Sequence, residues 1–103
     1  MVSVYIYLNG QSKAEDLMHT LLKKQLAAHA SVDYDNTISF LEDGKIKTKK
    51  QCLVTLQTKA MLFNSIVKLV QSEFGFDTRI YSLPITQANE NFSDFIRDNT
   101  LKI

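Results

Sequence analysis

Three side chains in this sequence carry the thiolate or imidazole groups that copper, zinc and similar ions prefer: Cys52, His19 and His29. Their spacing matches no CxxC, HxxxH or zinc framework. We expect His19 on the solvated side of a helix, His29 at a helix–strand junction and Cys52 on the apolar side of a strand. His29 and Cys52 are therefore candidate metal ligands. The alternatives are a polar junction residue for His29 and a buried core thiol for Cys52.

Groups for other chemistries are sparse. Asp33 and Asp35 lie two residues apart on one side of an expected strand, about 7 Å between Cα atoms. Paired carboxylates can bind a hard cation, and the alternative is a solvated strand face. The three glycines form neither a dinucleotide-binding nor a phosphate-binding loop. No nucleophile is paired with a base, so we expect no enzyme activity.

Composition narrows the class of protein. The 103 residues are 45% hydrophobic with a net charge of +1, which predicts one domain, residues 1–103, and gives no electrostatic attraction to nucleic acid. The single cysteine favours a reducing compartment. The sequence has no signal-peptide pattern at its start and no apolar run of the roughly 18 residues that a membrane helix needs. We expect a cytoplasmic protein with neither a nucleic-acid nor a membrane partner.

The elements that would position these groups centre on a long β-hairpin, residues 30–58. Apolar and polar residues alternate along both arms, the period of a strand with one buried face. Pairing the apolar positions places Phe40 opposite Ile46 and requires a three-residue loop, Glu42-Asp43-Gly44. The break in the alternation at Tyr34-Asp35-Asn36 predicts a β-bulge.

The length of this hairpin predicts an oligomer. Each arm has about 12 residues and would span about 40 Å, whereas a 100-residue domain has a radius of gyration of about 13 Å. Either the strands bend at the bulge or the tip extends past its own core. A projecting tip would expose apolar surface and unpaired strand edges. We therefore expect a second copy of the chain to cover it.

The other elements complete the order β-α-β-β-α-β with a short terminal helix. Strands are expected at residues 2–8 and 79–83, and helices at residues 12–28, 59–73 and 91–98. Ser12 and Glu15 fit a capping box for the first helix, and Thr58 could cap the second one, which Gly75 ends. The fold class is thus α+β: a ferredoxin-like split βαβ unit, with an antiparallel sheet and two helices on one face.

Several segments, in order and at consistent spacing, resemble those of the CutA family, which is named for divalent-cation tolerance. They are Gln25-Leu26-Ala27-Ala28 (K-L-A-A in the family), Asp43-Gly44-Lys45 (W-x-G-K), Gln57-Thr58 (K-T), Leu83-Pro84-Ile85-Thr86 (L-P-I/V-x) and Phe92-Ser93-Asp94-Phe95-Ile96 (Y-L-x-W-I/L). The resemblance covers nearly the whole chain. It implies a homotrimer, an architecture close to that of PII signalling proteins, and ligand sites in clefts between subunits.

The chain departs from the family pattern mainly where a cleft would lie. Leu41-Glu42 replaces the tip tryptophan, and Gln51 stands where an acidic residue is typical. Residues 73–78 lack the histidine and prolines of the family's H-P-Y-E-x-P segment, and His29 stands where a cysteine often follows L-A-A.

The resemblance implies candidate residues for an intersubunit cleft: Gln51, Phe76, Asp77, Arg79 and Phe95. Arg79 could receive an anion or pair with Asp77. The first hypothesis is a homotrimer linked to tolerance of copper or another divalent cation, with metal bound in these clefts. The alternative is a PII-like regulatory or assembly module whose cleft binds a small organic ligand or a partner protein.

Overall fold

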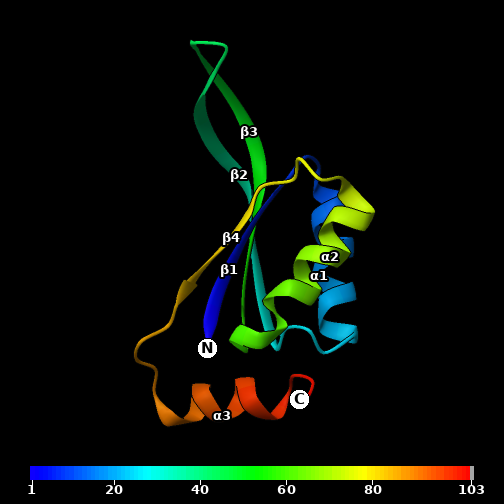
Figure 1. The fold of residues 1–103 in the computed structure, drawn as a ribbon, viewed down its shortest axis with the longest axis vertical. Coiled ribbons are helices and arrows are strands. Elements are labelled where there is room, and N and C mark those ends of the chain that lie inside the picture. Colours follow the sequence, from blue (N-terminus) through cyan, green and yellow to red (C-terminus); the bar gives the residue numbers. More distant parts are fainter. Residues whose placement is uncertain (103) are drawn as a thin grey trace.

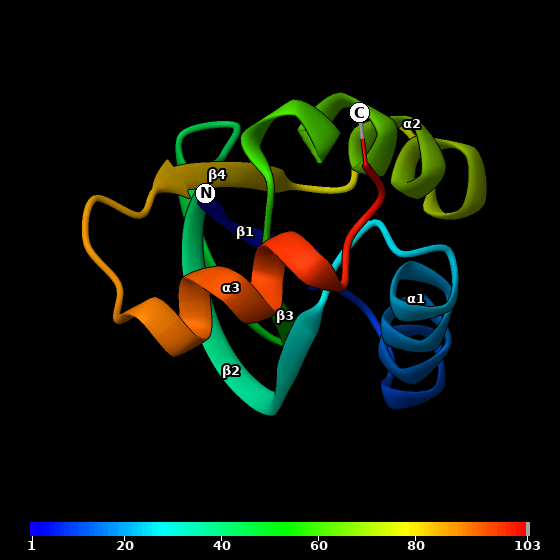
Figure 2. The same cartoon turned by 90° about the horizontal axis from the view of Figure 1, so that it is seen from below.

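The computed structural model describes residues 1–102 and confirms the α+β, ferredoxin-like arrangement. The elements are β1 (Val2–Leu8), α1 (Gln11–Lys23), β2 (His29–Glu42), β3 (Lys45–Thr58), the 3-10 turn η1 (Ala60–Leu62), α2 (Phe63–Phe74), β4 (Ile80–Pro84) and α3 (Glu90–Asp98). The four strands form one antiparallel sheet in the order β2-β3-β1-β4. Helices α1 and α2 cover one face of this sheet, and α3 crosses the end away from the hairpin tip (Figures 1 and 2).

The hydrophobic core lies between the sheet and the pair α1 and α2. Even-numbered residues of β1 and β3 face the helices, as the alternation predicted. Each helix contributes a stripe at helical spacing. The fully or almost fully buried core residues include Val4, Ile6, Val54 and Leu56 from the strands and Leu17, Leu21, Ile66 and Val70 from the helices. No helix within residues 1–102 is both long and apolar enough to cross a membrane.

The hairpin closes with a two-residue loop, so the predicted three-residue loop is wrong. Glu42 pairs with Lys45, and the φ angles of Asp43 and Gly44 are 53° and 75°. Two successive left-handed residues are typical of a type I′ turn, whose twist matches that of the flanking strands. The sequence Asp-Gly is the usual choice for such a turn.

The β-bulge lies where the sequence predicted it, at residues 33–36, and it explains the error in the loop. β2 contains one more residue there than β3. Even-numbered residues of β2 pair with even-numbered residues of β3 before the bulge and with odd-numbered residues beyond it, so beyond the bulge they lie on the opposite face of the sheet. Val32 pairs with Val54 as the apolar pattern requires, whereas Phe40 pairs with Lys47 and not with Ile46. Beyond the bulge, Phe40 therefore lies on the outer face of the sheet, the face away from α1 and α2.

Tyr34 in the bulge is anchored to α1. Its hydroxyl donates to Glu15 Oε1 at 2.9 Å, and Gln11 Nε2 donates to the same oxygen at 3.1 Å. The hydrogen bonds from Gln11 and from Tyr34 lower the pKa of Glu15 below its ordinary value. The predicted capping box is wrong because α1 begins at Gln11 without a side-chain cap, which leaves Ser12 inside the first turn. The helix also ends at Lys23, earlier than predicted.

Thr58 does not cap α2, contrary to the prediction. It ends β3, is fully buried, and its hydroxyl donates to the Leu26 carbonyl at 2.6 Å. This hydrogen bond joins the end of β3 to the segment that follows α1. Helix α2 begins at Phe63, after η1, and ends at Gly75, whose φ of 100° confirms the predicted stop.

The last elements lie close to their predicted positions. β4 is an edge strand that pairs only with β1, as expected for a strand ending at Pro84. Helix α3 buries Ile96 completely. Phe95, one of the candidate cleft residues, is 43% exposed on the same helix.

The hairpin extends past its own core, which decides between the two alternatives that the sequence left open. The molecule measures 44 × 27 × 21 Å (Figure 1). Leu8 at the end of β1 pairs with Cys52, so the first part of β3, residues 45–51, pairs only with β2. All residues from 41 to 50 are exposed, and the exposed fractions of Leu41 and Ile46 are 73% and 77%.

We expect Thr58→Val to lower the free energy of unfolding by about 1–3 kcal/mol. The substitution keeps the shape of the side chain but leaves the Leu26 carbonyl without its buried hydroxyl donor. Urea unfolding at a fixed chain concentration measures the effect. Thr55→Val is the matched control, because this half-buried residue on the same strand makes no side-chain hydrogen bond within residues 1–102; its cost should stay within about 0.5 kcal/mol. Equal costs for the two variants would contradict the assigned role of Thr58.

Candidate functional site

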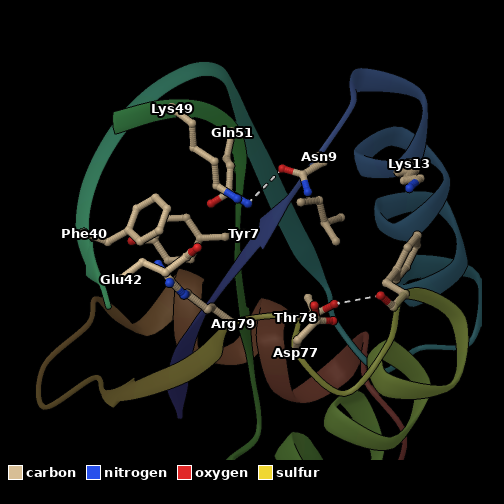
Figure 3. Close-up of a pocket in the computed structure, with 12 residues that line it drawn as sticks. Tyr7, Asn9, Lys13, Phe40, Glu42, Lys49, Gln51, Asp77, Thr78 and Arg79 are labelled. Carbon is tan, nitrogen blue, oxygen red and sulfur yellow. Dashed lines mark hydrogen bonds between the residues drawn. The ribbon is translucent and has the colours of Figure 1, made fainter. Parts of the chain in front are cut away.

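A pocket of about 340 Å³ lies at the base of the projecting hairpin (Figure 3). Its walls come from the hairpin, the end of β1 with the following loop, the first turns of α1 and the segment between α2 and β4. Five charged residues line it: Lys13, Lys49 and Arg79, with Glu42 and Asp77. The outer-face strand positions of Tyr7, Phe40 and Gln51 supply much of the remaining wall.

Three of the five residues predicted for a cleft meet in this pocket: Gln51, Asp77 and Arg79. Phe76 and Phe95 do not line it. Phe76 is 84% exposed in the loop after α2, and Phe95 lies on α3, at the end of the molecule away from the hairpin tip (Figure 1). Whether any of these residues belongs to an interface between subunits stays a prediction.

The sequence analysis missed Phe40 and Lys49. Ile38 pairs with Lys49, and Phe40 with Lys47, so Phe40 and Lys49 share the outer face. The predicted bulge could have revealed them. When the part of β2 beyond the bulge is shifted by one residue, the side chains of Phe40 and Lys49 fall on the same face of the sheet. No comparable signal pointed to Asn9 or Lys13, whose positions depend on how α1 packs on the sheet.

Two cations lie against the ring of Phe40. The Arg79 guanidinium carbon is 4.9 Å and Lys49 Nζ is 5.5 Å from the ring centroid, both within the range of cation–π attraction. Neither cation makes an ion pair in the part of the chain that the structure describes, and Lys13 makes none either. The pairing of Arg79 with Asp77 that the sequence allowed is not formed.

The buried side chain of Gln51 forms part of the pocket wall (Figure 3). Gln51 is 9% exposed, and its Nε2 donates to Asn9 Oδ1 at 2.9 Å. Its Oε1 is buried without a hydrogen-bond partner among residues 1–102. An unpaired buried amide oxygen is unfavourable, because it has lost water without gaining a donor.

A cluster of tyrosines continues the outer face beside the pocket. The ring centroids of Tyr5 and Tyr81 are 4.9 Å apart, and those of Tyr7 and Tyr81 are 6.5 Å apart. Hydrogen bonding with Tyr7, and then desolvation, raise the pKa of Tyr81 above its ordinary value. Tyr81 therefore stays neutral at physiological pH and adds no negative charge next to Arg79.

The two predicted metal ligands lie apart. His29 pairs in register with Gln57, five residues along β3 from Cys52 and thus about 17 Å away by strand rise. His29 is exposed, and its Nδ1 lies 2.8 Å from Gln57 Oε1. Since that oxygen only accepts, Nδ1 donates the hydrogen bond, and Nε2 is the ring nitrogen left for a metal ion. Cys52 is buried at 5% exposure, with Sγ 4.0 Å from the Tyr34 carbonyl oxygen.

The acidic pair on β2 lies in the bulge. Asp33 Oδ1 accepts the amide of Asp35, and Asp35 forms an exposed ion pair with Lys50 at 2.8 Å. Within residues 1–102, no three His, Cys, Asp or Glu side chains cluster in a way that could hold a metal ion. A single subunit therefore offers isolated ligands and no assembled metal centre in the described range.

Comparison with known families identifies the chain. The family model described as CutA1 divalent ion tolerance protein matches residues 2–99. The chain belongs to the CutA1 family. The sequence matches none of the curated proteins compared with it.

Solved CutA1 structures share the fold. CutA1 from Pyrococcus horikoshii is 23% identical, with a TM-score of 0.89 over 99% of this chain and 100% of that one. CutA1 from Oryza sativa is 18% identical, with a TM-score of 0.91 over 99% of this chain and 94% of that one. The protein titled periplasmic divalent cation tolerance protein CutA, from Archaeoglobus fulgidus, is 24% identical, with a TM-score of 0.89 over 96% and 98% of the two chains. At these identities the likeness concerns the fold alone.

We expect Asn9→Ala to lower the free energy of unfolding of this CutA1-family chain by about 1–2 kcal/mol. Asn9 itself is exposed, but its loss would leave the buried Gln51 amide without any hydrogen bond. In a Gln51→Leu background the same substitution should cost less than about 0.5 kcal/mol, because no polar group remains to be orphaned. Urea unfolding of the wild type, the two single variants and the double variant measures the coupling energy of this double-mutant cycle. An equal cost in both backgrounds would show that the hydrogen bond contributes nothing.

Proposed function

We propose that this protein acts in tolerance of divalent metal ions as a homotrimer, and that any ion it binds is held between subunits. Membership of the divalent ion tolerance family supports the role, and copper is the first ion to test. The projecting hairpin is the observation that carries the proposal of an assembly. We also assign the protein to the cytoplasm, because its one cysteine is buried and cannot form an intramolecular disulfide.

The hairpin offers two kinds of surface to a second copy. Residues 45–51 pair only with β2, so both strands have open edges beyond the end of β1, and open edges readily pair with another strand. Phe40, Leu41 and Ile46 line a shallow apolar hollow of about 450 Å³ at the tip. Burying this apolar surface would favour association.

The two edges of the sheet favour a closed ring of subunits. β2 and β4 are the edge strands, and they differ in length and sequence. A contact between the hairpin of one subunit and a different surface of the next is heterologous, and such contacts form rings when the rotation closes. A ring of three agrees with the trimer that the family resemblance implies.

Metal binding between subunits follows from the ligands that one chain provides. His29 is exposed, and the hydrogen bond of Nδ1 to Gln57 fixes the ring and leaves Nε2 as the nitrogen for a metal ion. A site with three or more ligands must then use side chains from several subunits, because residues 1–102 contain no such cluster. Cys52 remains a candidate for Cu(I), which prefers soft ligands, although reaching it requires opening of the core.

A second candidate function, a regulatory module that binds a small organic ligand, is favoured by the pocket. Its lining includes three cations without ion pairs within residues 1–102. Carboxylates and thiolates would suit a metal ion better than this set. The pocket and the metal proposal therefore concern different surfaces and can be tested separately.

We expect sedimentation equilibrium to give a mass of about 35 kDa, three chains of 11.8 kDa. Ile46→Asp should weaken the trimer by about tenfold or more, because it would bury a charge in the apolar contact. Met61→Asp is the matched control: Met61 is 63% exposed, compared with 77% for Ile46, but lies on η1. A wild-type chain that stays monomeric at high concentration would refute the assembly.

We expect the oligomer to bind Cu(II) or Zn(II), and His29→Ala to weaken that binding by about tenfold or more. His19→Ala is the matched control, since it removes an exposed imidazole from α1. Isothermal titration calorimetry measures both ions, and Cu(I) with Cys52→Ala tests the buried thiol. Failure to bind at micromolar concentrations, or equal binding by the wild type and both histidine variants, would rule out His29 as a ligand.

A further inference from the structure

We propose that the pocket at the base of the hairpin binds a small organic polyanion, a carboxylate or phosphate compound that also carries an N–H or O–H donor. This inference goes beyond the proposed role in ion tolerance and rests on the second candidate function, whose ligand class it specifies. It does not require the trimer, because every residue that supports it belongs to one chain. Two independent observations carry it: cations that make no ion pair within residues 1–102, and a buried amide oxygen without a donor in the same range.

The cations are held in place without being neutralised. Arg79 and Lys49 both lie against Phe40, and an aromatic ring attracts a cation through its quadrupole while leaving the net positive charge intact. An ion pair with a carboxylate would instead have satisfied the N–H donors. Arg79 keeps the planar fork of donors that suits a carboxylate or phosphate. The two side chains thus form a preorganised receptor for an anionic group.

Gln51 defines the second requirement on the ligand. Its side chain is nine-tenths buried and lines the pocket, and its Oε1 has no donor within residues 1–102. Because this oxygen is closed to solvent, a ligand N–H or O–H reaches it only when the Gln51 side chain turns toward the pocket, and that contact would remove the cost of an unpaired buried acceptor. A simple halide could not do so. The pocket should therefore prefer a compound with both an anionic group and a donor.

The carboxylates of the lining do not cancel the positive charge. Glu42 forms an ion pair at 3.0 Å with Lys47, which does not line the pocket. Asp77 is the remaining carboxylate, and the three cations Lys13, Lys49 and Arg79 outnumber the two acids. Asp77 adds a second acceptor for a ligand donor and disfavours anions that lack one.

The size of the pocket limits the ligand to a small molecule. About 340 Å³ is near the lower end of the range for small-molecule sites. A metabolite-sized compound fits this space, whereas a folded partner or a nucleic-acid duplex does not.

The test is a titration of the full-length protein, in its own assembly, with citrate and with AMP. Citrate carries carboxylates and a hydroxyl, and AMP carries a phosphate with hydroxyl and amino donors. Two-dimensional ¹⁵N NMR follows the side-chain amides of Gln51 and Asn9 directly. We expect at least one of the two compounds to shift these signals with a dissociation constant below about 1 mM, and the tighter one identifies the anionic group. Binding should weaken as salt rises, because screening reduces the attraction.

Matched variants separate the pocket from general surface charge. Lys49→Ala and Arg79→Gln should each weaken binding by about tenfold or more, and both residues are exposed, so folding should survive. Lys45→Ala removes the same charge from the same strand outside the pocket and should leave binding unchanged.

Three outcomes would overturn the proposal. The first is that neither citrate nor AMP shifts the Gln51 and Asn9 signals at about 10 mM, which includes the case in which a neighbouring copy fills the pocket. The second is equal weakening by Lys45→Ala and Lys49→Ala. The third is that uncharged glycerol binds as well as the anions. None of these outcomes bears on the mass in solution or on metal binding, so the proposed role in ion tolerance would stand or fall separately, whereas the second candidate function would lose its ligand site.

Discussion

One extra residue in β2 governs the outer half of this molecule. The bulge at residues 33–36 shifts the alternation of β2 against β3 by one position, and every side chain beyond it changes face relative to a regular hairpin. The shift sends Phe40 to the outer face, where it meets Arg79. The hydrogen bond from Tyr34 to Glu15 ties the bulge to α1, so the register of the projecting arm depends on the packed half of the domain.

Much of the fold could be predicted from the sequence, because each core element buries one face and shows it as a period. The strand Val2–Leu8 and the apolar side of β3 follow directly from alternation, and Gly75 ends α2 as expected. Errors arose where tertiary contacts override local preference. Ser12 and Thr58 both suit helix caps, yet the Thr58 hydroxyl donates to the Leu26 carbonyl, and α1 starts two residues earlier than the capping box requires.

Only part of the candidate site could be predicted from the sequence. Gln51, Asp77 and Arg79 could be placed together from the family resemblance, and the structure brings them to one pocket. Phe40 and Lys49 required the register of the hairpin beyond the bulge, and Lys13 required the position of α1 on the sheet. Such placements depend on contacts between elements distant in the sequence, which no local period records. Arm length, by contrast, is a local property, and it already limited the hairpin to two alternatives, a bend at the bulge or a projecting tip.

The identity of residue 51 connects the family pattern to the chemistry of the pocket. An acidic side chain is typical at this position, and a carboxylate there would add a third negative charge to a lining that has three cations and two acids. It would also compete for Lys49 and Arg79 as an ion-pair partner. With Gln51 in its place, the cations lie against Phe40, and the one buried side-chain polar atom without a partner within residues 1–102 is the neutral Gln51 Oε1. The same scaffold that could present a carboxylate to a metal ion therefore presents positive charge to an anion in this chain.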